Sequence, residues 1–233
     1  MNTLQTWIGY TGAAALAVVL GGVLLRRRYR VWYFFALFLA IMLGSTLMMM
    51  AWWSRFHTAG FWQAKETALD LVRFAMALEL AYRTFRAFPG ALATARWVLL
   101  FVLVVTFAVV LVSPGGSDYQ SFLGELHPRV LNGTIWLFTA IAAIILWYRI
   151  LVDPFHKSIL LGYVPFLLVF SLSMNVLGSL GAAKWERGWA VTYLYQISYL
   201  ALMVHWARAA WRRVEEPARP PALRTGMGQP ISA

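Results

Sequence analysis

The chain has 233 residues, a formal net charge of +11, and a composition that is 61% hydrophobic and only 12% charged. Soluble domains contain roughly 45–50% apolar and about 25% charged residues. The composition therefore excludes an ordinary soluble globular protein and predicts an integral membrane protein, for which the lipid bilayer is the solvent. The chain has no cysteine, which excludes disulfides, thiol catalysis and cysteine-ligated metals.

Seven apolar runs predict an all-α bundle of seven transmembrane helices. Each run reaches or approaches the roughly 20 residues that cross a bilayer. In chain order, the predicted spans are Trp7–Leu25, Val31–Trp53, Phe61–Phe85, Trp97–Ser113, Val130–Leu151, Ser158–Leu180 and Trp189–Trp211. Aromatic residues gather at the ends of these runs, as they do at membrane–water interfaces.

The basic residues between the spans, near their ends and in the tail predict the orientation of the chain. One side has fourteen of them, at 26, 27, 28, 30, 83, 86, 96, 149, 157, 208, 212, 213, 219 and 224, and the other side has five, at 55, 65, 129, 184 and 187. Positive residues stay in the cytoplasm, so the N-terminus is predicted outside and the C-terminus inside a bacterial inner membrane. The basic face is predicted to contact anionic lipid headgroups rather than nucleic acid.

Two regions are predicted along the chain. Residues 1–213 form the seven-helix transmembrane domain. Residues 214–233 are rich in proline, arginine and glycine and predict a disordered cytoplasmic tail. The first apolar run is followed, not preceded, by basic residues, which predicts a retained helix rather than a cleaved signal peptide.

The third predicted helix carries charges, which are costly inside a membrane. Glu66, Asp70 and Arg73 are spaced by four and three residues and therefore share one helix face. Arg73 falls near the middle of the span, where Asp70 is within reach as a partner. The pattern is compatible with a ligand, ion or proton site that opens outward, and also with the plainer alternative of an intrahelical ion pair that joins helix three to its neighbours.

Further polar side chains are predicted in the outer halves of the last two spans. Asn175 lies in the sixth span, and Tyr193 and Gln196 lie in the seventh. If their helix faces converge with Asp70 and Arg73, the bundle has a polar, outward-facing ligand-binding pocket. Interhelical hydrogen bonds are the plainer role of such residues.

Pro165 interrupts the sixth span and predicts either a hinge or a static kink. His156 and His205 lie near the inner ends of the last two spans, beside basic residues, and are predicted to contact headgroups. We find no nucleophile elbow, zinc-protease motif or P-loop. The sequence therefore predicts neither an enzyme nor a metal site, and it identifies no cofactor.

Two stretches carry a family resemblance. They are Arg26–Ala40, RRRYRVWYFFALFLA, and Phe61–Pro89, FWQAKETALDLVRFAMALELAYRTFRAFP. Together they resemble a group of uncharacterised bacterial seven-helix integral membrane proteins. The resemblance covers about the first 100 residues in pattern and the remainder in topology. It implies the fold and brings no activity with it.

Three functions are compatible with these observations. The first is a receptor-like or sensor-like protein that binds a ligand from outside and acts through a partner protein in the membrane. The second is a non-catalytic structural or assembly subunit of a larger membrane complex that binds pigment or lipid. The third is a transporter of a small solute that uses Glu66, Asp70, Arg73 and Glu79 along the third helix.

Overall fold

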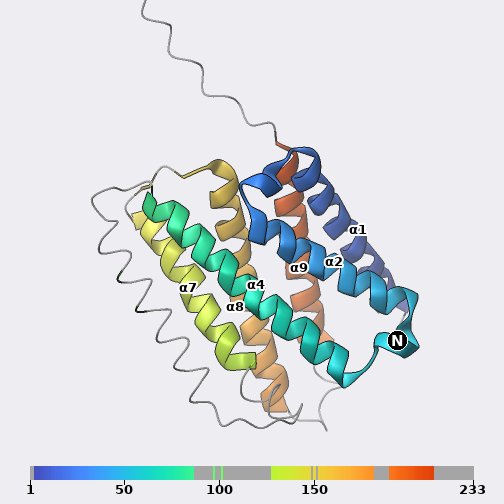
Figure 1. Cartoon of the computed structure of the whole chain (residues 1–233). Helices are drawn as coiled ribbons and strands as arrows, with labels where there is room; N and C mark the ends of the chain where they lie inside the picture. The colour runs from blue at the N-terminus through green and yellow to red at the C-terminus, as the bar shows by residue number, and fades with distance from the viewer. Residues whose placement is uncertain are drawn as a thin grey trace, which may run out of the picture.

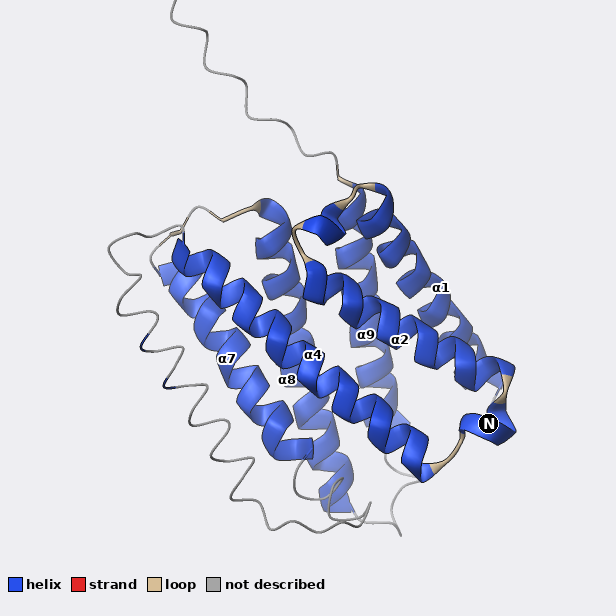
Figure 2. Ribbon diagram, viewed as in Figure 1, coloured by secondary structure: helices blue, strands red, loops and turns tan. Residues whose placement is uncertain are grey.

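The computed structural model describes residues 3–86, 97, 101, 127–147, 149–150, 152–180 and 189–212. Within these ranges the fold is all-α, with no strand (Figure 2). The elements are α1 (Thr3–Leu25), a 3-10 turn η1 (Arg28–Arg30), α2 (Tyr33–Ala51), the single turn α3 (Trp53–Phe56), α4 (Ala59–Arg86), α7 (His127–Trp147), α8 (Pro154–Leu180) and α9 (Trp189–Trp211).

Six of the seven predicted spans coincide with a long helix, within a few residues at each end. The all-helical prediction is therefore confirmed for the described residues. The fourth predicted span, Trp97–Ser113, lies outside the described residues except for Trp97 and Phe101, and the predicted tail 214–233 lies outside them entirely.

Three of the described helices are long and apolar enough to cross a membrane, over Trp7–Leu25, Tyr33–Ala51 and Pro154–Ser173. Leu131–Trp147 in α7 is apolar but shorter. Helix α4 has sufficient length, but charged residues such as Glu66, Asp70 and Arg73 lower its hydropathy.

The six long helices contact one another in a closed ring, in the order α1, α2, α4, α7, α8, α9 and back to α1 (Figure 1). Helices that are far apart in the sequence are thereby neighbours, since α9 packs against α1 and α7 packs against α4. The interior of the ring is filled by side chains from all six helices.

Tyr163 of α8 occupies the centre of this core and is 1% exposed. Its ring lies 5.7 Å from the ring of Phe38 in α2, 5.1 Å from that of Phe138 in α7 and 5.5 Å from that of Trp206 in α9, measured between centroids. Aromatic pairs at 4.5–7 Å contribute roughly 0.5–1.5 kcal/mol each beyond the area they bury. One residue therefore joins α8 to three other helices through its ring.

Helices α8 and α9 pack closely because Gly162 has no side chain. A Cβ atom added there would lie 2.9 Å from His205 Cδ2, 2.9 Å from Leu202 Cδ1 and 3.0 Å from Trp206 Nε1. Small residues allow such close approach of membrane helices.

This contact generates a stability prediction. Gly162→Ala is expected to lower the free energy of unfolding by about 1–3 kcal/mol, because an overpacked core must shift. Gly44→Ala is the matched control, since a Cβ there meets no atom within 4 Å. Chemical or thermal unfolding in mild detergent, followed by tryptophan fluorescence, measures both. An equal effect of the two substitutions would show that the α8–α9 contact is looser than described.

Candidate functional site

Four of the charged residues of α4 form a cluster that faces the interior of the ring. Arg73 donates a hydrogen bond from Nη1 to Asp70 Oδ1 at 2.6 Å, and the same nitrogen lies 3.9 Å from Glu66 Oε2. The Nζ atom of Lys65 lies 2.9 Å from Glu66 Oε1. We call Lys65, Glu66, Asp70 and Arg73 the α4 charge cluster. It contains two cations and two carboxylates, so its formal charge is balanced.

The α4 charge cluster is connected to other helices through Arg73. The Nε atom of Arg73 donates a hydrogen bond to the hydroxyl of Tyr163 in α8 at 3.1 Å. Its guanidinium carbon lies 5.8 Å from the ring centroid of Phe38 in α2, within the range of a cation–π contact. The side chains of Arg73 and Asp70 are only 11% and 9% exposed. Arg73 therefore bonds to α8 and contacts α2 from α4 while it remains almost entirely buried.

Tyr195 of α9 lies on the same side of the bundle as the cluster. Its ring centroid is 5.2 Å from that of Phe170 and 6.0 Å from that of Phe166, both in α8. Phe166 in turn stacks on Tyr163, the hydrogen-bond partner of Arg73, with their ring centroids 6.1 Å apart. The cluster is thus bordered by an aromatic wall from α8 and α9.

The structure brings together only some of the predicted site residues. Glu66, Asp70 and Arg73 form one cluster, as the four-and-three spacing predicts. Gln196 is half-buried on α9, and its Oε1 is buried with no hydrogen-bond partner among the described residues. Tyr193 is half-buried on α9, whereas Asn175 is exposed on α8 rather than buried with Arg73.

Pro165 lies inside α8, which continues as a helix on both sides of it. Proline has no N–H, so the backbone bond to the carbonyl of Leu161 is missing at this point. Tyr163, the partner of Arg73, is two residues away. The bond between α4 and α8 is therefore made at the place where the hydrogen-bond ladder of α8 is broken.

A second ion pair lies farther along α4, separated from the first by the buried apolar residues Met76 and Ala77. Arg83 Nη2 lies 3.0 Å from Glu79 Oε1, one helical turn away on the same face of α4. Glu79 Oε2 accepts a hydrogen bond from the backbone N–H of Phe34 at 3.3 Å, and Arg83 donates to the carbonyl of Val31. Glu79 thus caps the start of α2 with a side chain from another helix.

The headgroup contact predicted for His156 is wrong. His156 is 2% exposed, its ring lies 5.0 Å from that of Trp32, and its Nε2 lies 3.3 Å from Thr84 Oγ1. Thr84 donates its own hydroxyl hydrogen to the carbonyl of Leu80, so it accepts a hydrogen from His156. The turn before α8 buries this histidine in the core. His205 is exposed, with Nε2 3.0 Å from the carbonyl of Ser158.

Sequence reasoning missed Tyr163. It left Tyr195 out of the candidate site, and it counted Lys65 among the residues of a connection. No spacing rule within one helix connects residue 73 to residue 163, because that contact is made between helices. The proximity of Tyr163 to Pro165 was the one signal in the sequence that marked this segment. Among the described residues, no three histidine or acidic side chains are grouped as metal ligands.

We compared the chain with protein-family models, with curated proteins and with solved structures, and none of them matches it. The chemistry of the site therefore has to be inferred from the arrangement of its own residues. A balanced, nearly buried set of charges joined to a second helix is suited to binding or to structural support.

The ion pair generates a prediction that can be measured by a double-mutant cycle. Arg73→Ala is expected to cost about 3–5 kcal/mol, because it leaves the Asp70 carboxylate buried without its cation. In an Asp70→Asn background the same substitution is expected to cost less, with a coupling energy of about 0.5–3 kcal/mol. Asp70→Asn alone is expected to be milder, since Glu66 lies near Arg73 as a substitute. Unfolding of the four proteins in detergent measures the cycle, and purely additive losses would contradict the pair.

Proposed function

We propose that the protein is a receptor-like or sensor-like membrane protein of seven transmembrane helices, with its N-terminus outside a bacterial inner membrane. The α4 charge cluster is its ligand-responsive site, and a partner protein receives the signal. The observation that carries this proposal is the hydrogen bond from Arg73 to Tyr163. It connects a set of charges to a helix at the point where that helix lacks a backbone bond.

The balanced charge of the cluster favours a small zwitterionic ligand. Such a ligand presents a carboxylate to Lys65 or Arg73 and an ammonium group to Glu66 or Asp70. Binding weakens the existing pairs, because each guanidinium or carboxylate has a limited number of hydrogen-bonding directions. Release of Tyr163 by Arg73 then changes the bend of α8 about Pro165. A ligand shifts such an equilibrium only by its difference in affinity for the two states.

The non-catalytic subunit is the second candidate, and two observations favour it. Arg73 is already engaged by Asp70 and Tyr163, and Lys65 by Glu66. A cluster that satisfies its own charges also serves as a static support between helices. Exposed tryptophans such as Trp136 and Trp147, at 74% and 84%, offer surface to a neighbouring subunit or pigment in the bilayer. Native mass spectrometry and an absorption spectrum of gently purified protein distinguish the two: other subunits or a chromophore at fixed stoichiometry favour the subunit.

The orientation generates a labelling prediction that benefits from the absence of native cysteine. Ser54 and Arg30 are both exposed and flank α2. We expect Ser54→Cys to react with a membrane-impermeant maleimide in intact cells, and Arg30→Cys to react only after the cells are permeabilised. The reverse labelling pattern would show that the chain has the opposite orientation, with its N-terminus in the cytoplasm. Equal labelling of both positions in intact cells would contradict a membrane crossing by α2.

The ligand proposal generates a prediction for thermal stability. In a panel of the twenty amino acids at millimolar concentration, at least one is expected to raise Tm. Tm should rise by roughly 2–4 °C for each kcal/mol by which the bound amino acid stabilises the folded protein. Glu66→Gln is expected to abolish the shift, because it removes one charge from the α4 charge cluster. Glu79→Gln, which alters the second ion pair of the same helix, is expected to keep it.

The measurement is intrinsic fluorescence of the purified protein, which has 12 tryptophans. A shift that survives Glu66→Gln unchanged would place the ligand elsewhere. If none of the amino acids changes the Tm of the wild-type protein, the cluster is a static support between helices. That result would favour the second candidate function, a non-catalytic subunit of a membrane complex.

A further inference from the structure

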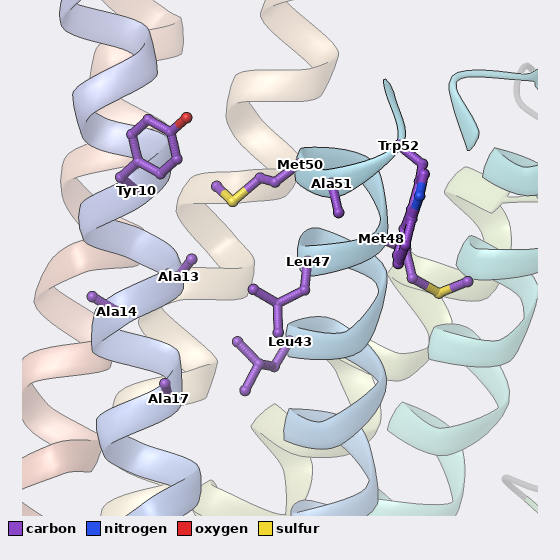
Figure 3. A pocket seen from close by; sticks show the side chains of 10 residues that line it. All are labelled: Tyr10, Ala13, Ala14, Ala17, Leu43, Leu47, Met48, Met50, Ala51 and Trp52. Carbon is purple, nitrogen blue, oxygen red and sulfur yellow. The ribbon is translucent and has the colours of Figure 1, made fainter. Parts of the chain in front are cut away.

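A groove runs between α1 and α2 on the outside of the bundle, and we call it the α1–α2 groove. It has a volume of about 730 Å³, within the roughly 300–1,000 Å³ of typical small-molecule sites. Figure 3 shows Leu43, Leu47 and Met50 of α2 extending toward α1, where Ala13 and Ala17 form the opposite wall. The groove exists partly because these alanines are too small to fill the space between the helices.

The two walls separate because each helix packs against a different neighbour. In α1, a Cβ on Gly12 would lie 3.3 Å from Tyr199 of α9, and the carbonyl of Val18 accepts a hydrogen bond from Trp211 Nε1 at 3.1 Å. In α2, Phe34 and Phe38 contact Glu79 and Arg73 of α4. α1 therefore packs against α9 and α2 against α4, and the contact between α1 and α2 leaves this part of their interface unfilled.

The ends of the groove differ in chemistry from its middle. The middle is lined by alanine, leucine and methionine, whereas Tyr10 and Trp52 line one end and are 55% and 60% exposed. Tyrosine and tryptophan settle at the level of lipid headgroups. The turn α3 starts directly after Trp52, and the backbone N–H of Arg55 bonds to the Trp52 carbonyl at 3.1 Å. An exposed cation therefore lies one turn beyond the aromatic end of an apolar groove.

We propose that the α1–α2 groove binds one acyl chain of a phospholipid whose phosphate contacts Arg55. An apolar channel with interfacial aromatics and a cation at one end complements a molecule with an apolar tail and an anionic head. Arginine pairs well with phosphate because its planar donors match the phosphate oxygens. The flexible side chains of Met48 and Met50 adapt to a chain of variable shape. This proposal requires that the bundle lies in a membrane, as the proposed function also does. It does not depend on a ligand at the α4 charge cluster.

The α1–α2 seam continues toward the other end of the two helices in a smaller groove of about 230 Å³. It is lined by Leu20 and Leu24 of α1 and by Ala36 and Ala40 of α2, which continue the same helix faces at spacings of three and four residues. Tyr29 and Tyr33 also line this smaller groove. Both grooves therefore have tyrosine in their lining, since Tyr10 lines the larger one. This site has room for less of an acyl chain, and the test is therefore made on the larger groove.

The test is native mass spectrometry of the full chain, purified in a detergent that strips bulk lipid and then incubated with phosphatidylglycerol. Ala17→Phe fills the groove and is expected to reduce the fraction carrying one lipid by at least about fivefold. Ala140→Phe is the matched control, because it puts the same ring on an exposed alanine of α7, and it is expected to bind as the wild type does. Arg55→Ala is expected to weaken lipid retention while preserving the fold.

Three results with these variants and the wild type would overturn the proposal, and a wild-type chain that retains no lipid would overturn it as well. The first is retention of lipid by Ala17→Phe at the level of the Ala140→Phe control. The second is a wild-type dimer that Ala17→Phe dissociates, since a second copy would then occupy the groove. The third is unchanged retention of lipid by Arg55→Ala, which would show that Arg55 does not contact the phosphate.

If Ala17→Phe is not recovered, Ala13→Leu replaces it. A chain that purifies without detergent would refute the membrane placement itself, whereas a chain that requires detergent but retains no lipid would refute only the lipid site.

Discussion

The hydrogen bond between Arg73 and Tyr163 is the contact on which the described bundle depends. Tyr163 touches α2, α7 and α9 with its ring and α4 with its hydroxyl, so it contacts four other helices from α8. Arg73 is charged and nearly buried, and a buried charge is tolerated only when it is paired and hydrogen-bonded. The positions of these two residues therefore constrain each other, and the helices that carry them must keep their register.

The two halves of the bundle are stabilised in different ways. The half that contains the basic turn is held by contacts between segments far apart in sequence. Arg28 donates from Nη2 to the Arg212 carbonyl at 2.7 Å and lies 4.4 Å from the ring of Phe155. A cation at this position also interacts favourably with the negative end of the α9 dipole. The half that contains the α4 charge cluster combines balanced charges with the larger of the two grooves between α1 and α2.

The fold was largely predictable because it depends on patterns within single segments. Apolar run length located the helices, and the spacing of Glu66, Asp70 and Arg73 placed them on one face. Contacts between helices were not predictable in this way, because periodicity shows which face is apolar but not which helix it meets. Tyr163 was missed for that reason. His156 was misplaced because its basic neighbour Lys157 suggested an interface, whereas the turn at Pro154 directs the histidine into the core.

The candidate site was predicted in part. The intrahelical pair of Asp70 and Arg73 follows from spacing alone, whereas convergence with residues of α8 and α9 depends on helix packing. The Oε1 atom of Gln196 is buried with no hydrogen-bond partner in the described part of the chain, which is compatible with a polar site, but Asn175 is exposed and contributes no buried group. Polar residues in the same half of different helices share a depth in the membrane, and depth does not determine the direction in which each side chain points.

We call the contacts of Arg73 with Asp70 and Tyr163 the Arg73 junction. Its most direct test is a solid-state NMR measurement on the protein in lipid bilayers, with isotope labels in arginine and aspartate. We predict a strong dipolar coupling between the guanidinium of Arg73 and the carboxylate of Asp70, as the 2.6 Å contact requires. We also predict slow hydrogen exchange at Arg73 Nε, and faster exchange there in Tyr163→Phe. A guanidinium that shows no coupling to a carboxylate and exchanges as fast as free arginine would contradict the junction.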